Sequence, residues 1–129
     1  MNIVAIAGNL GNTPELRQTQ NNRDVCNLRV PTNRRWVDKS GELKEATDWI
    51  NVTVWDKQAR ACANNLTVGR WVNVEARLRE RERQVGDETI RVLEVVANRV
   101  QFGPRPNNTR SETMNLNTGP VADTNTIPE

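Results

Sequence analysis

The segment DWINVTVWD, residues 48–56, constrains the fold more than any other part of the chain. Aliphatic residues alternate through it with polar and aromatic ones, and those aliphatic residues are Ile50, Val52 and Val54. Successive side chains of a β-strand point to opposite faces, so this alternation predicts a half-buried strand. Trp49 and Trp55 then share the second face with Asn51 and Thr53, and we predict that this face is exposed.

Similar patterns predict four further strands, at residues 2–10, 25–30, 71–81 and 90–102. The first is apolar on both faces, which suggests that another subunit covers its second face. Pro31 predicts a bulge or a sheet edge before Trp36. Segments around Gly41 and Gly86 predict two hairpin turns. The inward residues of the fourth strand are expected to be Val72, Val74, Ala76 and Leu78.

One short helix is predicted after the strand that carries Trp49 and Trp55. Its apolar residues have the i, i+3, i+4, i+7 spacing of an amphipathic helix: Ala59, Cys62, Ala63 and Leu66. Asp56 is the expected N-cap. Three strands, a helix and two strands fit an all-β chain of the OB-fold class, a five-stranded Greek-key barrel with the helix between strands three and four.

The 129-residue chain is predicted to form one domain, residues 1–102, followed by a disordered tail, residues 103–129. The tail is rich in Asn, Thr, Pro and Gly, and such a segment cannot bury enough apolar surface to offset its ordering entropy. The longest apolar run, residues 3–7, is too short to span a bilayer. The chain begins with strand-like sequence and no leader pattern, so we expect a cytoplasmic protein without a membrane partner.

Composition argues against an enzyme. The chain contains no histidine, which removes the commonest general base and metal ligand. Its two cysteines, Cys26 and Cys62, are too few for a zinc site, and we favour buried free thiols over a disulfide. No carboxylate cluster stands out. The sequence therefore predicts no catalytic residue, no metal and no cofactor, and it disfavours a nuclease.

The face that carries Trp49 and Trp55 has two interpretations. Both tryptophans could be buried core residues, since tryptophan is highly buried on average. Alternatively they form a stacking platform for unpaired bases, where each stacked base is worth about 1–3 kcal/mol. Asn51 and Thr53 favour the second interpretation, because burial of that face would bury their polar groups.

A row of arginines at every second position supplies the complementary charge: Arg77, Arg79, Arg81 and Arg83. Glu80 and Glu82 interleave with them, which is also compatible with a merely solvated face, but in a regular strand these acids point to the other side. Four cations on one face are suited to follow a phosphate backbone. Only three of the 18 basic residues are lysine, and arginine can both pair with phosphate and stack on a base. The predicted DNA-binding set is completed by Trp36, Arg35 and Lys57.

Single-stranded nucleic acid fits this pattern better than a duplex. Proteins that read duplex DNA usually insert a helix into the major groove. The predicted helix is short, and its only cations are Lys57 and Arg60.

Five segments resemble the bacterial-type single-stranded DNA-binding proteins, the SSB family. They are GNLGNTPELR (residues 8–17), WVDKSGELKEATDW (36–49), VTVWDKQAR (52–60), VEARLRER (74–81) and EVVANRVQF (94–102). Through these segments the resemblance extends in order over essentially all of residues 2–102. The resemblance implies an OB-fold, a homotetramer with a dimer contact through residues 2–10, and sequence-independent binding and protection of single-stranded DNA in replication, recombination and repair. It places base-stacking aromatics at Trp36, Trp49 and Trp55, and a bacterial, nucleoid-associated location.

The chain departs from the family pattern at three places. Arg83 and Gln18 stand where the family usually has aromatic residues. The family's main members end in an acidic tip with Pro-Phe that recruits partner enzymes, whereas this sequence ends ADTNTIPE. Recruitment through the tail is therefore doubtful, and an accessory paralogue or a plasmid- or phage-associated copy would suit this ending. The alternative function is an OB-fold protein-interaction adaptor of a primosome-like assembly, since exposed aromatics and arginines also mark protein interfaces.

Overall fold

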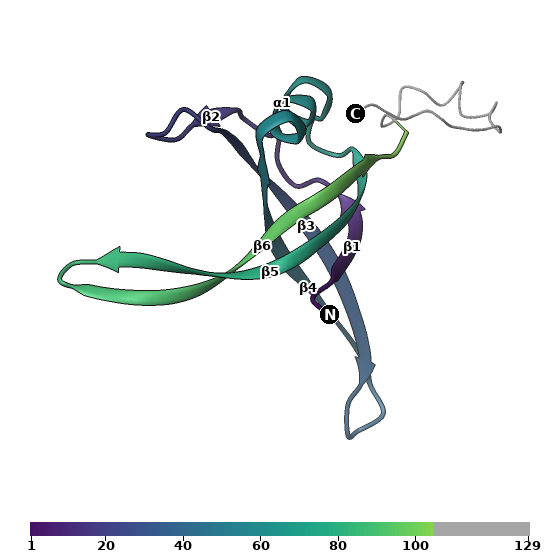
Figure 1. Cartoon of the computed structure of the whole chain (residues 1–129). Coiled ribbons are helices and arrows are strands. Elements are labelled where there is room, and N and C mark those ends of the chain that lie inside the picture. The colour runs from purple at the N-terminus through teal and green to yellow at the C-terminus, as the bar shows by residue number, and fades with distance from the viewer. Residues whose placement is uncertain (105–129) are drawn as a thin grey trace.

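The computed structural model describes residues 1–104, which form a curled sheet with one helix at an end of the barrel (Figure 1). In chain order the elements are β1 (Val4–Asn9), β2 (Arg17–Gln18), β3 (Asp24–Val37), β4 (Leu43–Trp55), α1 (Asp56–Asn65), β5 (Trp71–Val85) and β6 (Glu88–Phe102). The five predicted strands and the helix are all present. The two-residue β2 is an addition that the alternation did not indicate.

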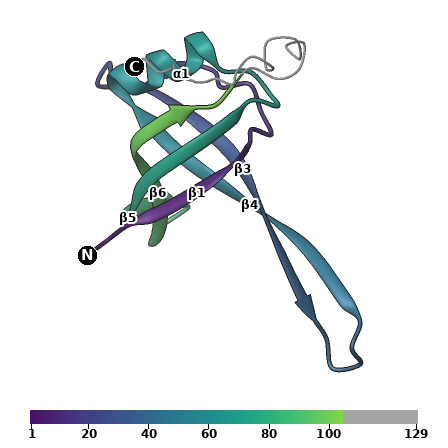
Figure 2. The same ribbon diagram turned by 90° about the vertical axis from the view of Figure 1, so that its right-hand side faces the viewer.

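Strand order and closure identify the barrel. The sheet runs β1-β5-β6-β4-β3-β2, with β4 and β6 parallel and the other neighbours antiparallel. The end strand β1 approaches β3, which lies next to the other end strand, β2. A Cβ at Gly8 would lie 2.6 Å from the carbonyl oxygen of Pro31, so only glycine fits there. Beyond this point Gly11 N donates to Arg29 O at 2.8 Å. The curled sheet therefore closes on itself, as Figure 2 shows, and the OB-fold prediction is confirmed.

The core lies inside this barrel and under α1. The inward residues of β3 are buried, as alternation predicted, and so are Val72, Val74 and Ala76 of β5. On β4, Val52 and Val54 are buried, whereas Ile50 is only partly buried. The helix contributes Ala59 and Cys62, and both cysteines are buried and not joined by a disulfide, as predicted. The buried apolar set is Leu10, Cys26, Leu28, Val30, Val52, Val54, Ala59, Cys62, Leu66, Val72, Val74, Ala76, Val96 and Ala97.

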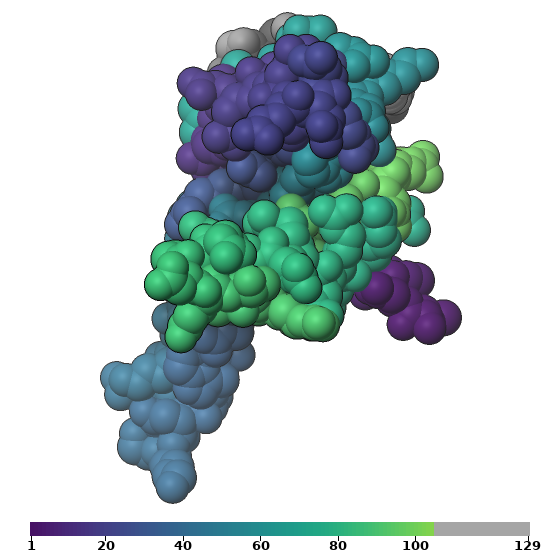
Figure 3. Space-filling view, turned by 60° about the vertical axis from the view of Figure 1, so that its left-hand side comes forward, coloured from purple at the N-terminus to yellow at the C-terminus, as the bar shows by residue number. Residues whose placement is uncertain are grey.

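Two hairpins extend beyond the barrel as arms. The β3–β4 arm turns at Gly41 and the β5–β6 arm turns at Gly86, with φ of 85° and 61° that favour glycine. Both turns were predicted. Figure 1 shows the two arms standing clear of the barrel and pointing in different directions, and Figure 3 shows the β3–β4 arm projecting from the lower end of the molecule. The arms expose apolar residues as well as polar ones outside the core, among them Val37, Leu43 and Leu93.

Three local predictions are wrong. No bulge follows Pro31, because β3 and β4 pair without interruption from Val25↔Trp55 to Val37↔Leu43, whereas the register shift lies in β5 at Glu75/Ala76. Leu78 is 41% exposed because it lies where β5 leaves the barrel and no longer faces the core. Asp56 is not an N-cap: Trp55 holds that position without a side-chain capping bond.

No helix within residues 1–104 is long and apolar enough to cross a bilayer. Of the predicted tail, residues 105–129 lie outside the described residues.

Candidate nucleic-acid interface

Strand β4 carries the two central tryptophans on the outer face of the barrel, because Val52 and Val54 fill the inner face. Trp49 is 46% exposed, so the interpretation of a core residue is wrong for it. Trp55 is half-buried. Asn51 is exposed between them, as the alternation predicted. The outer face of β4 is therefore an aromatic surface, more open at Trp49 than at Trp55.

Trp49 rests on the backbone of Gly11. A Cβ at Gly11 would lie 2.4 Å from Cζ3 of the indole, so only glycine allows the ring this close. The guanidinium of Arg29, from the neighbouring strand β3, lies 5.1 Å from the ring centroid. This distance is within the range of a cation–π contact.

Trp55 is covered by a second arginine. The Cζ of Arg23 lies 4.5 Å from the centroid of the indole. The same guanidinium donates to the carboxylate of Asp56, from Nε to Oδ1 at 3.2 Å and from Nη2 to Oδ2 at 2.7 Å. The hydrogen bonds from Arg23 hold the pKa of the Asp56 carboxyl below its usual value. Trp55 Nε1 is buried and has no hydrogen-bond partner among residues 1–104.

The arginines of β5 share this outer face, and Glu94 of β6 joins them to β4. One oxygen of Glu94 accepts from Arg79 at 3.0 Å and lies 3.4 Å from Arg81 Nε. Its other oxygen accepts from Thr53 Oγ1 at 3.0 Å. Thr53 lies between Trp49 and Trp55 on β4, so the tryptophans and arginines form one continuous surface. We call this surface, Trp49, Trp55, Thr53, Glu94, Arg79 and Arg81, the outer face.

The arginine row is not of a single sign, contrary to our expectation. Glu94 neutralises part of the charge of Arg79 and Arg81, and its side chain is only 12% exposed. Alternation along β5 alone could not reveal an acid contributed by β6. The interleaved Glu80 does point to the other side, where it pairs with Arg91 at 2.9 Å.

Arg77 and Arg83 lie at the two ends of the arginine row on β5. Arg77 is half-buried near the barrel, where Nη1 donates to Asn98 Oδ1. Arg83 is exposed towards the tip of the β5–β6 arm, opposite Ile90. No ion pair of Arg83 is present in the described part of the chain.

Three other predicted residues lie away from the outer face or at its border. Trp36 is 42% exposed on the β3–β4 arm, but the unbroken register puts it on the opposite side of the ribbon from Trp49. The structure therefore does not bring these two rings onto one strand face. Arg35 does share the side of Trp49 and pairs with Glu45 at 3.3 Å. Lys57 is exposed in the first turn of α1.

Four residues of the interface were not predicted: Gly11, Arg23, Arg29 and Glu94. Arg29 had a usable signal, because it alternates outward on β3 and its partner across the sheet is Asn51. Arg23 and Gly11 lie outside the regular strands, so no periodicity could place them. Within residues 1–104, no group of three or more His, Cys, Asp or Glu side chains is arranged to hold a metal ion.

The closed barrel with its helix places the chain in the OB-fold class of proteins, and the aromatic and cationic outer face is of the kind that single-strand binders of this class use. The single-strand binding protein family model matches residues 1–103, and the chain belongs to this family.

Curated relatives include single-stranded DNA-binding protein 1 of Chlorobaculum tepidum, 37% identical over 91 residues, or 68% of this chain and 56% of that protein. The single-stranded DNA-binding protein of Neisseria meningitidis is 35% identical over 103 residues, or 79% of this chain and 59% of that protein. The chain therefore spans less than two thirds of the length of these relatives.

Solved structures agree with the fold. A Plasmodium falciparum SSB complex with single-stranded DNA matches with a TM-score of 0.70 and 26% identity, covering 81% of this chain and 96% of that one. A deletion mutant of the Thermus aquaticus single-stranded DNA binding protein matches with a TM-score of 0.72, covering 82% of this chain and 52% of that one. The second match is only 24% identical and supports the fold alone.

Proposed function

We propose that this protein binds and protects single-stranded DNA without sequence preference, in replication, recombination and repair, and that it is not an enzyme. The observation that carries the proposal is the continuous outer face, on which Thr53 and Glu94 connect the tryptophans of β4 to the arginines of β5. Family membership and the match to an SSB–DNA complex support it.

The proposed binding combines two physical terms. Bases stack on Trp49 and on the Trp55 site, which accept any base because every base has a π-face. Arginines of β5, with Arg35 and Lys57 as further cations, neutralise phosphates. Trp36 offers a ring on the β3–β4 arm, so a strand that contacts it must pass around that arm. In duplex DNA the bases stack on one another, so they cannot stack on these tryptophans.

The test is tryptophan fluorescence during titration with a thymine homopolymer and, separately, with duplex DNA, at low and at high salt. The chain has four tryptophans and no tyrosine, so the emission reports tryptophan alone. We expect the single strand to quench the emission and the duplex to leave it nearly unchanged. Binding should weaken with salt, because phosphate neutralisation releases counterions. Equal quenching by duplex DNA, or none by either nucleic acid, would contradict the proposal and favour a protein-docking face.

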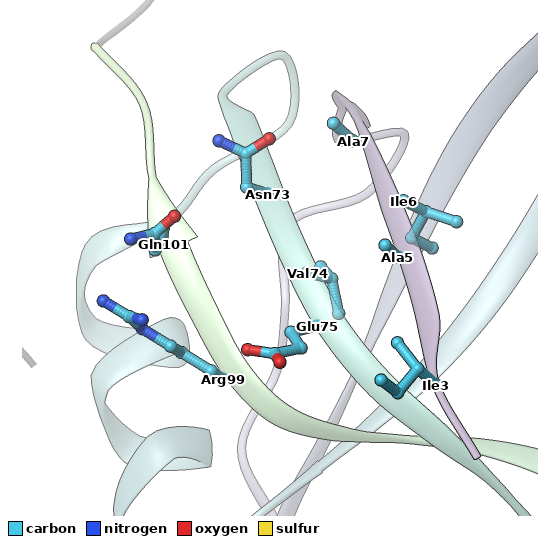
Figure 4. A pocket seen from close by; sticks show the side chains of 9 residues that line it. All are labelled: Ile3, Ala5, Ile6, Ala7, Asn73, Val74, Glu75, Arg99 and Gln101. Carbon is cyan, nitrogen blue, oxygen red and sulfur yellow. The ribbon is translucent and has the colours of Figure 1, made fainter. Parts of the chain in front are cut away.

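We propose also that two copies meet through residues 2–10, within a homotetramer. Strand β1 is an end strand of the sheet, and its outward side is open in the single chain: Ala5 is exposed, and Ile3, just before the strand, is 59% exposed. A shallow pocket of about 410 Å³ lies beside them, with Ala5 and Ala7 on one side and polar residues of β5 and β6 on the other (Figure 4). An apolar strand edge next to polar partners is suited to a second copy of the same surface.

A charge on this edge should break the proposed contact. We expect Ile3→Glu to shift the mass measured by sedimentation equilibrium to a smaller species. The matched control is Leu43→Glu, since Leu43 is 63% exposed at the end of the β3–β4 arm, away from β1 (Figure 2). An Ile3→Glu protein that retains the mass of the unmodified protein would exclude this contact.

The further proposals concern domain limits and location. We propose that residues 1–102 form the DNA-binding domain and that residues 103–129 are a disordered tail. Limited proteolysis should then leave a fragment close to residues 1–102, and a stable full-length chain would contradict this division.

We propose also that the protein is cytoplasmic and associated with the nucleoid. A fluorescent fusion should then overlap the nucleoid, and a fusion that does not overlap it would refute this location.

A further inference from the structure

We propose that Arg23 is a base-stacking residue of this protein. Its guanidinium packs on Trp55, and a bound base stacks on the guanidinium. This inference rests on the proposed function and adds a residue to it. Neither the alternation of the strands nor the resemblance to the family points to Arg23, which lies in the turn before β3.

The first support is the position of the guanidinium. Its Cζ lies 4.5 Å from the Trp55 ring centroid, while the Arg23 side chain is 51% exposed. Trp55 is half-buried, with its Nε1 fully enclosed. A ligand that approaches the Trp55 site from solvent therefore meets Arg23 as well as the indole.

The second support is the way in which Asp56 holds the guanidinium. All five N–H groups of arginine lie in the plane of the guanidinium, so the bonds from Nε and Nη2 to Asp56 use its edge. These bonds leave both faces of the group available for stacking. One face is available to Trp55 and the other to a base, because arginine stacks on both indoles and bases.

The backbone at Asp56 supports this role. Its φ is 58°, in the left-handed region that few residues other than glycine, asparagine and aspartate adopt. In that conformation the carboxylate accepts both bonds from Arg23 and makes no helix-capping bond. A residue at the start of α1 is thus used to orient the arginine.

A base that replaced Arg23 on Trp55 would break the cation–π contact and both bonds to Asp56. A base that stacks on the side of the guanidinium facing away from Trp55 breaks none of these interactions. The second arrangement also keeps the positive charge beside the phosphate of the bound nucleotide. The structure therefore favours a composite stack of base, Arg23 and Trp55 over displacement of the arginine.

The chain offers a matched control in Arg60. Its side chain is also 51% exposed and also paired with an aspartate, Asp24, but no cation–π contact of Arg60 is present among residues 1–104. Substitution by lysine keeps the charge at either position and removes the planar group that stacks. Arg23→Lys and Arg60→Lys therefore separate stacking from charge.

The experiment measures the affinity for a fluorescein-labelled thymine oligonucleotide by anisotropy, at low and at high salt. We expect Arg23→Lys to weaken binding by about two- to fivefold, the size of a stacked-cation contribution at an exposed site. The loss should persist at high salt, and Arg60→Lys should bind like the unmodified protein. In a Trp55→Ala background the loss from Arg23→Lys should become smaller, because no ring then supports the group.

Three results would overturn the inference. In the first, Arg23→Lys binds the oligonucleotide as tightly as the unmodified protein does. In the second, Arg23→Lys binds more tightly, which would mean that Arg23 only covers the ring. In the third, Arg60→Lys loses as much affinity as Arg23→Lys. Thermal unfolding of both variants checks the fold, which an exposed ion pair affects little. The proposed function fails separately, if the unmodified protein does not bind the oligonucleotide or if Trp49→Ala leaves binding unchanged.

Discussion

Replacing Trp49 and Trp55 together by alanine should weaken binding of a thymine oligonucleotide by at least about thirtyfold. Each base–aromatic stack is worth about 1–3 kcal/mol, and every 1.4 kcal/mol is tenfold in affinity. The loss should remain at high salt, because stacking is not screened as phosphate contacts are. Anisotropy of a labelled oligonucleotide is the measurement, since the tryptophan signal itself changes in this variant.

Trp71→Ala is the control for that experiment. Trp71 is 40% exposed, similar to Trp49, but it lies at the start of β5 against Gly103, where a Cβ would lie 2.8 Å from its Cδ1. We expect this variant to bind almost normally. Unchanged binding in the Trp49→Ala/Trp55→Ala protein would show that the outer face does not stack bases.

Leu28→Ala should lower the free energy of unfolding by about 2–5 kcal/mol, the range for a large core residue replaced by alanine. Leu28 is fully buried in β3, and the cavity left by its side chain lies among residues that cannot all move inwards. Urea denaturation followed by circular dichroism measures the change. Protein concentration must be equal across variants, because assembly contributes to apparent stability.

Leu93→Ala removes the same atoms from a site that is 71% exposed on β6. We expect a change within about 0.5 kcal/mol, as for surface substitutions. Similar losses for Leu28→Ala and Leu93→Ala would mean that the barrel interior does not dominate stability, or that a second copy buries Leu93.

Much of the fold could be predicted because burial is periodic along a regular strand. Alternation placed Val52 and Val54 inside and Trp49 outside, and the helical spacing placed Ala59 and Cys62 against the core. This reasoning lost accuracy where strands leave the barrel: Leu78 continues the inward parity of β5, yet there is no core beneath it. The alternation of residues along a strand tells only on which side of the strand a side chain lies. How far the core extends along that side depends on the packed barrel.

The interface was less predictable, because its electrostatics depend on neighbours that are distant in sequence. Arg79 and Arg81 stood out as cations, but Glu94 lies 15 residues beyond Arg79 and meets it only through pairing of β5 with β6. The resemblance places Trp36 among the base-stacking aromatics, but β3 and β4 keep one register along their whole paired length, so its ring lies on the other side of the arm from Trp49.

The sequence by itself determined the strand faces, the helix, the two hairpin turns and the class of surface, because each depends on the local order of apolar, aromatic and charged residues. The tertiary structure alone decided which of these groups meet. Arg23 lies over Trp55 and is paired with Asp56, 33 residues away, because the antiparallel pairing of β3 with β4 sets Val25 opposite Trp55 and so brings the turn before β3 next to the start of α1. A side chain's partners follow from the path of the whole chain, and no local pattern encodes that path.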